Sequence, residues 1–182
     1  FVGQNAIITD DISVMEKADK LVLPGVGAFG DAIATIRNKG IDNVIYDGIN
    51  KGKPFLGICL GMQMVFDKSY EYGEYKGLGL IPGTIQLLPD NVKKPHIGWN
   101  NLNIKMREPL FKNIGESPCA FILSGNRCTS SIGYYWLWKR DTSGSTKRQY
   151  LCFAISPRKK RWCRSWNFKE FWRIIICKFI LL

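Results

Sequence analysis

The sequence predicts an α/β fold, in which helices flank a parallel sheet, on three observations. Short apolar segments at 6–9, 21–23 and 54–58 are typical of buried strands. Between the second and the third of these segments, isoleucines recur at helical spacing, at positions 33, 36, 41, 45 and 49. The order strand, helix, strand is that of a parallel sheet with right-handed crossovers.

The remaining elements follow in chain order. Residues 10–17 predict a polar connection between the first two strands, and the helical segment ends at Gly52. A second helical pattern begins behind the third strand, at 62–66. Residues 77–88 mix glycine with apolar residues, which predicts short strands and turns, and 102–104 predict one further strand.

Charge is distributed unevenly along the chain. The 182 residues include 26 Lys and Arg against 15 Asp and Glu, a net charge of +11. Residues 1–124 carry 13 basic and 13 acidic residues, so the whole excess lies in 125–182. This second segment also holds five of the six tryptophans and four of the six cysteines. We therefore divide the chain into an α/β domain, 1–124, and a basic tail, 125–182.

Composition excludes several classes of protein. A length of 182 residues fits one domain with a substantial core. No stretch reaches the ~18 apolar residues of a membrane helix, and no secretory signal opens the chain, so we expect a cytoplasmic protein. The cysteines lack the paired spacing of a disulfide framework. His96 is the only histidine, which excludes a histidine-rich metal site, and we expect neither a metal nor a cofactor.

Cys59 has the setting of a nucleophile elbow. Gly57 and Gly61 flank it two residues to either side, and it lies between a predicted strand and a predicted helix. Glycine is required there because the backbone passes close to itself in so sharp a turn. The N-terminus of a helix also favours the thiolate, which is the nucleophilic form. The alternative is a small buried cysteine beside packing glycines.

A second glycine-rich loop, residues 24–30, follows the second strand. Its three glycines and one proline can turn backbone N–H groups toward a developing negative charge, although an ordinary glycine turn is an equal alternative. Ligands of parallel α/β sheets bind at the carboxyl ends of the strands. Because this loop and Cys59 both follow such ends, the sequence predicts that they form one site.

Three strings, in this order and spacing, resemble class I glutamine amidotransferases. They are Pro-Gly-Val-Gly-Ala-Phe-Gly at 24–30, Gly-Ile-Cys-Leu-Gly-Met-Gln at 57–63 and Pro-His-Ile-Gly-Trp-Asn at 95–100. The first and third resemble, more narrowly, the glutaminase subunits of imidazole glycerol phosphate synthase in histidine biosynthesis. The resemblance covers residues 1 to about 124 and implies a flavodoxin-like sheet. The family's first strand and helix are absent, so we expect a fragment that begins at Phe1.

The resemblance also implies a reaction and the residues that perform it. Cys59 attacks the side-chain amide of the substrate glutamine, and the ammonia passes to a cyclase partner that makes imidazole glycerol phosphate and AICAR. Backbone N–H groups of Leu60 and of the loop residues Gly25, Val26 and Gly27 hold the oxyanion.

Three further residues belong to the resembling strings. Gln63 is expected to contact the substrate, with a surface helix residue as the alternative. His96 and Trp99 resemble a segment near the substrate and the partner face. His96 is expected to be an ordinary loop histidine rather than the catalytic base, because the family's base lies near its C-terminus.

The tail departs from the family, whose members end in a His-Pro-Glu segment and a short helix. That segment supplies the general base and its orienting carboxylate, but no histidine follows His96 here. If residues 154–160 are encoded GCA ATT TCA CCC AGA AAA AAG, a frame moved forward by one base encodes Gln-Phe-His-Pro-Glu-Lys. The tryptophan codon TGG becomes a glycine codon in the same frame, where the family has glycines. We therefore predict that residues from about 125 onward are a frameshifted translation with a non-native fold, and that the chain is inactive as written.

Other interpretations stay open. The tail could be a genuine basic, aromatic segment that binds nucleic acid or anionic lipid, but it carries no nucleic-acid module signature. Residues 158–161 match a localisation signal only weakly. Another class I amidotransferase, of pyridoxal phosphate or folate pathways, is disfavoured by the string at 95–100, and a nonenzymatic binding protein is the third alternative. We expect neither nucleic acid nor membrane as a partner.

Overall fold

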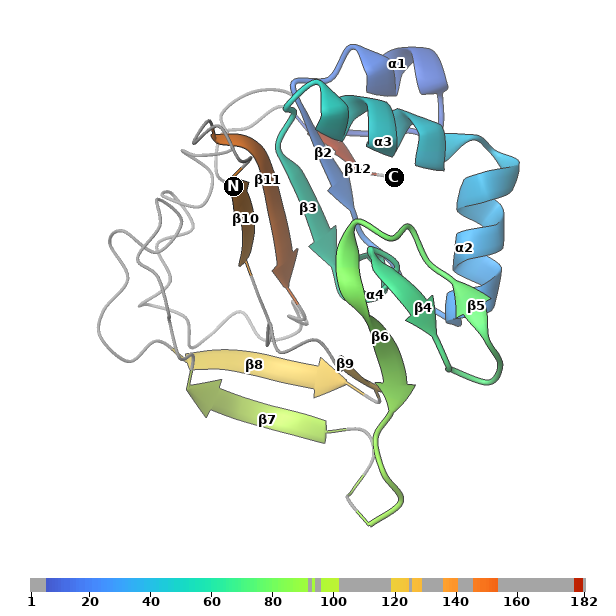
Figure 1. Cartoon of the computed structure of the whole chain (residues 1–182), viewed down its shortest axis with the longest axis vertical. Coiled ribbons are helices and arrows are strands. Elements are labelled where there is room, and N and C mark those ends of the chain that lie inside the picture. Colours follow the sequence, from blue (N-terminus) through green and yellow to red (C-terminus); the bar gives the residue numbers. More distant parts are fainter. Residues whose placement is uncertain are drawn as a thin grey trace.

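The main sheet runs through the middle of the molecule (Figure 1). The computed structural model describes residues 6–91, 93, 96–101, 119–124, 126–128, 136–140, 146–153 and 179–181. Within them the strand order of this sheet is β1–β12–β2–β3–β11–β10. The bounds are β1 (Ala6–Ile8), β12 (Phe179–Leu181), β2 (Lys20–Leu23), β3 (Phe55–Ile58), β11 (Thr146–Phe153) and β10 (Trp136–Arg140). All neighbours are parallel except the pair β10–β11, so the predicted α/β fold with a parallel sheet is confirmed.

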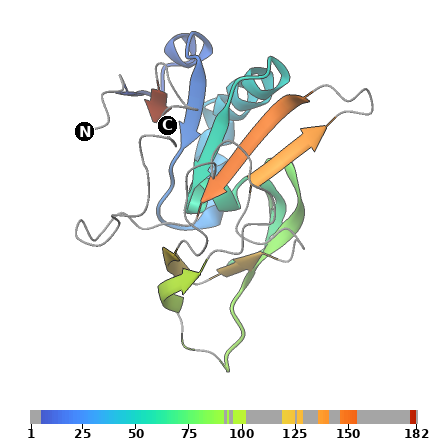
Figure 2. The same cartoon turned by 90° about the vertical axis from the view of Figure 1, so that its left-hand side faces the viewer.

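Two helices connect β2 to β3, as the isoleucine spacing predicts. They are α2 (Phe29–Asn38) and α3 (Ile41–Asn50), and the five periodic isoleucines are all buried. Gly40 separates the helices with φ of 71°, a backbone conformation that glycine adopts without strain. Figure 2 shows β2, β3 and β11 side by side, with the helices packed behind the strands.

The polar connection expected at 10–17 contains the short helix α1 (Ile12–Glu16), which the sequence did not predict. Asp11 caps this helix: its carboxylate accepts the backbone N–H of Ser13 at 2.8 Å. Met15 is completely buried and anchors the helix in the core. Five residues are too few for a periodic pattern, so the sequence did not indicate a helix here.

The helix expected at 62–66 is also wrong in extent. The helix α4 (Leu60–Gln63) is a single turn, and Phe66 opens the strand β4 (Phe66–Ser69). Met64 and Val65, between them, are almost completely buried. A short apolar run satisfies a helical and a strand pattern equally well, so its burial could be predicted but its conformation could not.

Two smaller sheets complete the described part of the chain. One has the order β5–β4–β6–β9, and the other pairs β7 with β8. Their bounds are β5 (Tyr75–Lys76), β6 (Ile81–Leu87), β9 (Asn126–Cys128), β7 (His96–Asn101) and β8 (Cys119–Ser124). Residues 77–88 were predicted to form short strands and turns, and they contain instead the single strand β6 of seven residues. The strand predicted at 102–104 lies outside the described residues.

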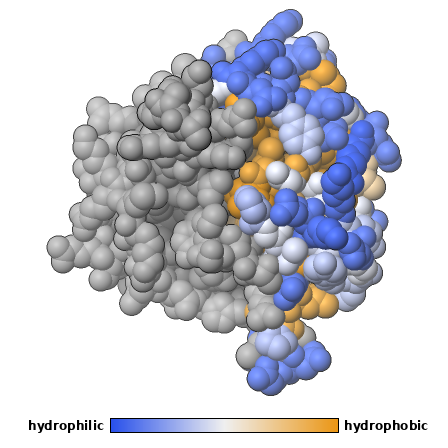
Figure 3. All heavy atoms as spheres, viewed as in Figure 1, coloured by the Kyte–Doolittle hydropathy of each residue, from blue (hydrophilic) through white to orange (hydrophobic). Residues whose placement is uncertain are grey.

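One apolar core joins the main sheet to the sheet of β4 and β6. Ile81 and Ile85 of β6 and Phe66 of β4 belong to the same buried cluster as α2 and α3. In the space-filling view, apolar residues are visible beside the hydrophilic residues that cover most of the described part of this face (Figure 3). The β4–β6 layer is therefore packed directly against the helices that precede Cys59.

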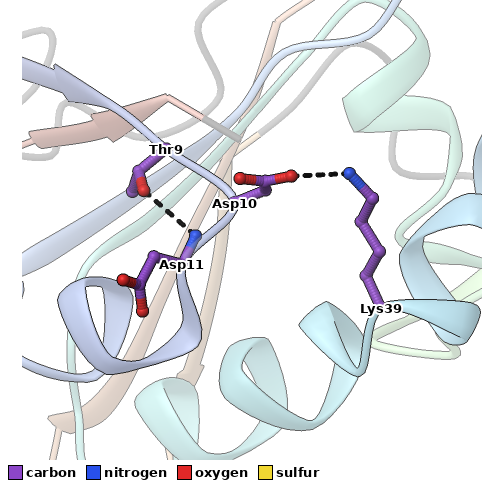
Figure 4. A network of polar contacts seen from close by, with 4 residues as sticks. All are labelled: Thr9, Asp10, Asp11 and Lys39. Carbon is purple, nitrogen blue, oxygen red and sulfur yellow. Dashed lines mark hydrogen bonds and ion pairs between the residues drawn. The ribbon is translucent and has the colours of Figure 1, made fainter.

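An exposed polar network ties the end of β1 to α2. Lys39, at the C-cap of α2, donates to the Asp10 carboxylate at 2.6 Å, and Thr9 accepts the backbone N–H of Asp11 at 3.0 Å (Figure 4). The hydrogen bond and the charge of Lys39 lower the pKa of Asp10. Both side chains are exposed, so the pair contributes little to stability.

Among the described helices, none has the length and apolar character needed to cross a membrane.

Candidate active site

Cys59 occupies a strained turn between β3 and α4. Its backbone has φ of 57° and ψ of −119°, a combination that residues with a side chain rarely adopt. Its thiol is free, and the residue is exposed. The predicted nucleophile elbow is thus present as a geometry, and the alternative of a buried packing cysteine is wrong.

The flanking glycines allow the turn to pack against its neighbours. A Cβ atom at Gly57 would lie 2.8 Å from the Cα atom of Met62, and one at Gly61 would overlap the carbonyl oxygen of Leu23. The first clash lies within the turn and the second with the end of β2. Glycine at both positions therefore fixes Cys59 at the carboxyl edge of the sheet.

The glycine-rich loop packs on the first turn of α4. A Cβ atom at Gly25 would lie 2.7 Å from the backbone nitrogen of Gly61 and 2.8 Å from the Cβ atom of Leu60. Val26 is 91% exposed, and Gly27 has φ of 94°. The structure thus brings the loop and the elbow together, as predicted from their places at strand ends.

Backbone N–H donors are available at this junction. The first intrahelical hydrogen bonds run from Met62 and Gln63 to the carbonyl oxygen of Cys59, at 3.0 and 3.1 Å. The N–H groups of Leu60 and Gly61 precede these bonds, as in the first turn of any helix. The oxyanion hole expected from the N–H groups of Leu60 and of the glycine-rich loop stays a prediction.

Gln63 is the last residue of α4, one turn after Cys59, and is half-buried. His96 and Trp99 lie on β7, where their backbones pair with Ser124 and Phe121 of β8. His96 therefore opens a strand, and its expected place in a loop is wrong. β7 belongs to neither of the two sheets that flank Cys59, and the contacts predicted for Gln63, His96 and Trp99 stay predictions.

The strand beside β3 was not predicted from the sequence. β11 pairs with β3 in parallel, and Cys152 and Phe153 lie opposite Gly57 and Ile58. β11 and β3 therefore end at the same level, next to Cys59. Residues 154–160, on which the frameshift hypothesis depends, follow β11 in the sequence and lie outside the described residues. The apolar run at 150–153 was the available signal for the strand.

The contact of Glu71 with α2 was also not predicted from the sequence. Its carboxylate accepts the backbone N–H of Phe29, the first residue of α2, at 2.8 Å. The two residues are 42 positions apart in the sequence, and no sequence motif links them.

The described residues contain no cluster of three or more His, Cys, Asp or Glu side chains that could hold a metal ion.

Fold and site together define an α/β protein with a cysteine nucleophile elbow at the carboxyl edge of a parallel sheet. Residues 3–103 match the family model of the CobB/CobQ-like glutamine amidotransferase domain. The chain is 47% identical over 160 residues to the imidazole glycerol phosphate synthase subunit HisH of Aquifex aeolicus, which covers 85% of this chain and 77% of the relative. The chain therefore belongs to the glutamine amidotransferase family.

Further relatives carry the same name. The HisH subunit of Oceanobacillus iheyensis is 43% identical over 122 residues, 67% of this chain and 61% of the relative. That of Caldanaerobacter subterraneus is 48% identical over 114 residues, 63% of this chain and 56% of the relative. The chain thus spans less than two thirds of the length of these two relatives. The alignment with the Aquifex protein, in contrast, is too long to fit within 1–124 and enters the tail, so the division near residue 125 stays a prediction.

Proposed function

We propose that the chain carries the nucleophile and the oxyanion site of a glutaminase that supplies ammonia for imidazole glycerol phosphate synthesis. One observation carries the proposal: the exposed Cys59, on its strained turn, immediately precedes Leu60, against which Gly25 is packed. The likeness to HisH subunits supports glutamine as the substrate.

The reaction begins with attack of the Cys59 sulfur on the side-chain carbonyl carbon of glutamine. The new C–S bond converts the carbonyl oxygen into an oxyanion, which accepts hydrogen bonds from the backbone N–H of Leu60 and from the loop at 24–27. The C–N bond then breaks, ammonia leaves with a proton taken from the thiol, and a glutamyl thioester remains. Water hydrolyses the thioester and releases glutamate.

A general base must carry that proton, and the written sequence does not supply the family's histidine. The frameshift hypothesis accounts for its absence. β11 and β3 end at the same level, and Cys59 follows β3 directly. A histidine encoded shortly after residue 153 would therefore follow the strand that ends beside Cys59. If residues 150–153 are encoded TAT CTG TGC TTT, the shifted frame gives Ile-Cys-Ala-Leu. An apolar strand can therefore form at this place in either frame.

A cyclase subunit is the proposed partner, and the cytoplasm the proposed location. Ammonia is lost to water unless it passes directly to the next active site, so a glutaminase of this kind is expected to act in a complex. The printed names of the relatives describe subunits of a synthase, which supports this proposal.

The gene sequence tests the frameshift first. If the bases under residues 154–160 cannot encode His-Pro-Glu in another frame, the hypothesis is rejected. If they can, a frame-restored chain and the written chain are assayed for glutamate release from glutamine, each with and without the cyclase. General acid–base catalysis raises a reaction rate by about 10²–10⁴-fold. The written chain is therefore expected to release glutamate more slowly than the frame-restored chain by that factor. The Cys59→Ala variant of the restored chain sets the background.

The same comparison addresses the basic tail. If the tail has its own function, the written chain binds single-stranded nucleic acid with an affinity that falls steeply with salt, and the frame-restored chain does not. Glutaminase activity of the restored chain without such binding by the written chain favours the frameshift.

A further inference from the structure

The glycine-rich loop leads directly into a helix that lacks a cap of its own. Residues 24–28, here called the oxyanion loop, end at Ala28, the N-cap of α2. Alanine offers no side-chain acceptor, and none caps the helix from this position. The first backbone N–H groups of α2 therefore depend on acceptors from elsewhere in the fold.

Glu71 supplies one of these acceptors. Its carboxylate oxygen lies 2.8 Å from the backbone nitrogen of Phe29, in a half-buried setting. A negative charge at the N-terminus of a helix is favoured both by the hydrogen bond and by the helix dipole. The donor is itself immobile, because the Phe29 side chain is completely buried.

The segment that carries Glu71 is tightly attached to α2. The ring of Tyr75 lies 6.4 Å from that of Phe29, and it fills the space where Gly30 lacks a side chain. At the other end of the helix, Arg37 donates to the carbonyl oxygens of Lys76 and Gly77 at 2.9 and 3.0 Å. The hairpin of β4 and β5 is thus fixed along the length of α2.

Glu71 is also oriented from its own side. The hydroxyl of Ser69, which is completely buried, accepts the backbone N–H of Glu71 at 3.2 Å. The neighbouring Tyr70 donates its backbone N–H to Ile85 of β6 at 2.8 Å. The carboxylate is therefore presented to α2 by a backbone that two elements hold in place.

The oxyanion loop consequently has two attachment points. Gly25 is wedged against Leu60 and Gly61 at one end, and Phe29 is hydrogen-bonded to Glu71 at the other. Between them, Val26, Gly27 and Ala28 are exposed. We infer that Glu71 is a positioning residue, which holds the oxyanion loop in place through the N-terminus of α2. This inference rests on the proposed glutaminase function.

The test must not depend on turnover, because the written chain lacks the general base. Alkylation of Cys59 meets this requirement. A chloromethyl ketone analogue of glutamine forms a C–S bond at its methylene carbon and releases chloride, while its carbonyl oxygen occupies the oxyanion site and the thiol proton goes to the buffer. Chloroacetone reacts in the same way but lacks the amino-acid group. Iodoacetamide alkylates the thiol by direct displacement and reports its general reactivity. Mass spectrometry of the Cys59 peptide gives each rate.

Two substitutions are compared with a matched control in the same hairpin. Glu71→Ala removes the acceptor, and Glu71→Gln keeps a weaker, uncharged one. Glu74→Gln removes an equivalent charge from an exposed ion pair with Lys68 and leaves α2 untouched. We expect Glu71→Ala to lower both chloroketone rates, relative to iodoacetamide, by roughly tenfold. Glu71→Gln is expected to fall between this variant and the unsubstituted chain, and Glu74→Gln to equal that chain.

Each outcome has a distinct meaning. If the Glu71 variants slow only the glutamine analogue and not chloroacetone, Glu71 contacts the ligand and the positioning role is refuted. Equal slowing with all three reagents, or with none, refutes it as well. If the unsubstituted chain shows no preference for the glutamine analogue over iodoacetamide, and glutamine does not protect Cys59, the proposed function itself fails.

Discussion

The backbone of Cys59 is predicted to store strain that glycine would relieve. Its φ of 57° and ψ of −119° place a side chain in a region that only glycine enters freely. Such conformations cost of order 1–3 kcal/mol. The Cys59→Ala variant removes the thiol but keeps the Cβ atom, and therefore the strain, whereas Cys59→Gly removes both.

The expected difference between these two variants follows from two opposing terms. Relief of strain favours glycine by roughly 2 kcal/mol, and the greater freedom of glycine in the unfolded chain opposes it by about 0.5–1 kcal/mol. Cys59→Gly should therefore be more stable than Cys59→Ala by about 1 kcal/mol. At Ala34, an exposed residue inside α2, the same exchange has no strain to relieve and should cost about 1 kcal/mol.

Urea unfolding of the four proteins, followed by circular dichroism, measures these differences. The prediction is an opposite sign at the two positions and a gap of about 2 kcal/mol between them. If glycine destabilises position 59 by as much as it destabilises position 34, the elbow is not strained.

Further predictions concern packing, pH and the two proposals above. Gly61→Ala should destabilise the fold by about 3 kcal/mol in urea unfolding, because the new Cβ atom overlaps the Leu23 carbonyl oxygen. Gly27→Ala should cost only about 1 kcal/mol, because no atom lies within 4 Å of its Cβ position although φ is 94°. Equal losses of stability in the two variants would contradict the packing explanation. The pKa of Asp10 is lowered in the folded chain, so its contribution to stability is complete above the ordinary value of 3.8 and is lost as the pH falls through the lower folded value. Lys39→Gln should abolish that part of the acid dependence, and an unchanged acid profile would show that the pair is not formed. Frame restoration should raise glutaminase turnover, and Glu71→Ala should lower chloroketone alkylation of Cys59, as set out above.

Sequence reasoning succeeded where a local pattern determines local structure. The isoleucine spacing predicted α2 and α3, and the glycines around Cys59 predicted the elbow, because each pattern reports a requirement met within a few residues. It failed at α1 and at the end of α4, where the segments are too short for periodicity to decide.

Contacts between distant segments could not be predicted in the same way. The hydrogen bond from Phe29 to Glu71 and the pairing of β11 with β3 each join residues far apart in the chain. Nothing in the local composition of either segment identifies its partner. The exception is the pairing of the oxyanion loop with Cys59, which followed from a rule about strand ends rather than from the residues themselves.

The pairing of β11 with β3 determines what a frameshift in the tail would change in the structure. Strand formation requires apolar, β-forming residues at 150–153, and both reading frames can supply them, so the sheet beside β3 is insensitive to the shift. The general base, in contrast, depends on the identity of one side chain after the strand, and under the frameshift hypothesis only the shifted frame would encode a histidine there. A change of frame can therefore leave the nucleophile, its strained turn and its oxyanion donors in place and still remove the group that moves the proton.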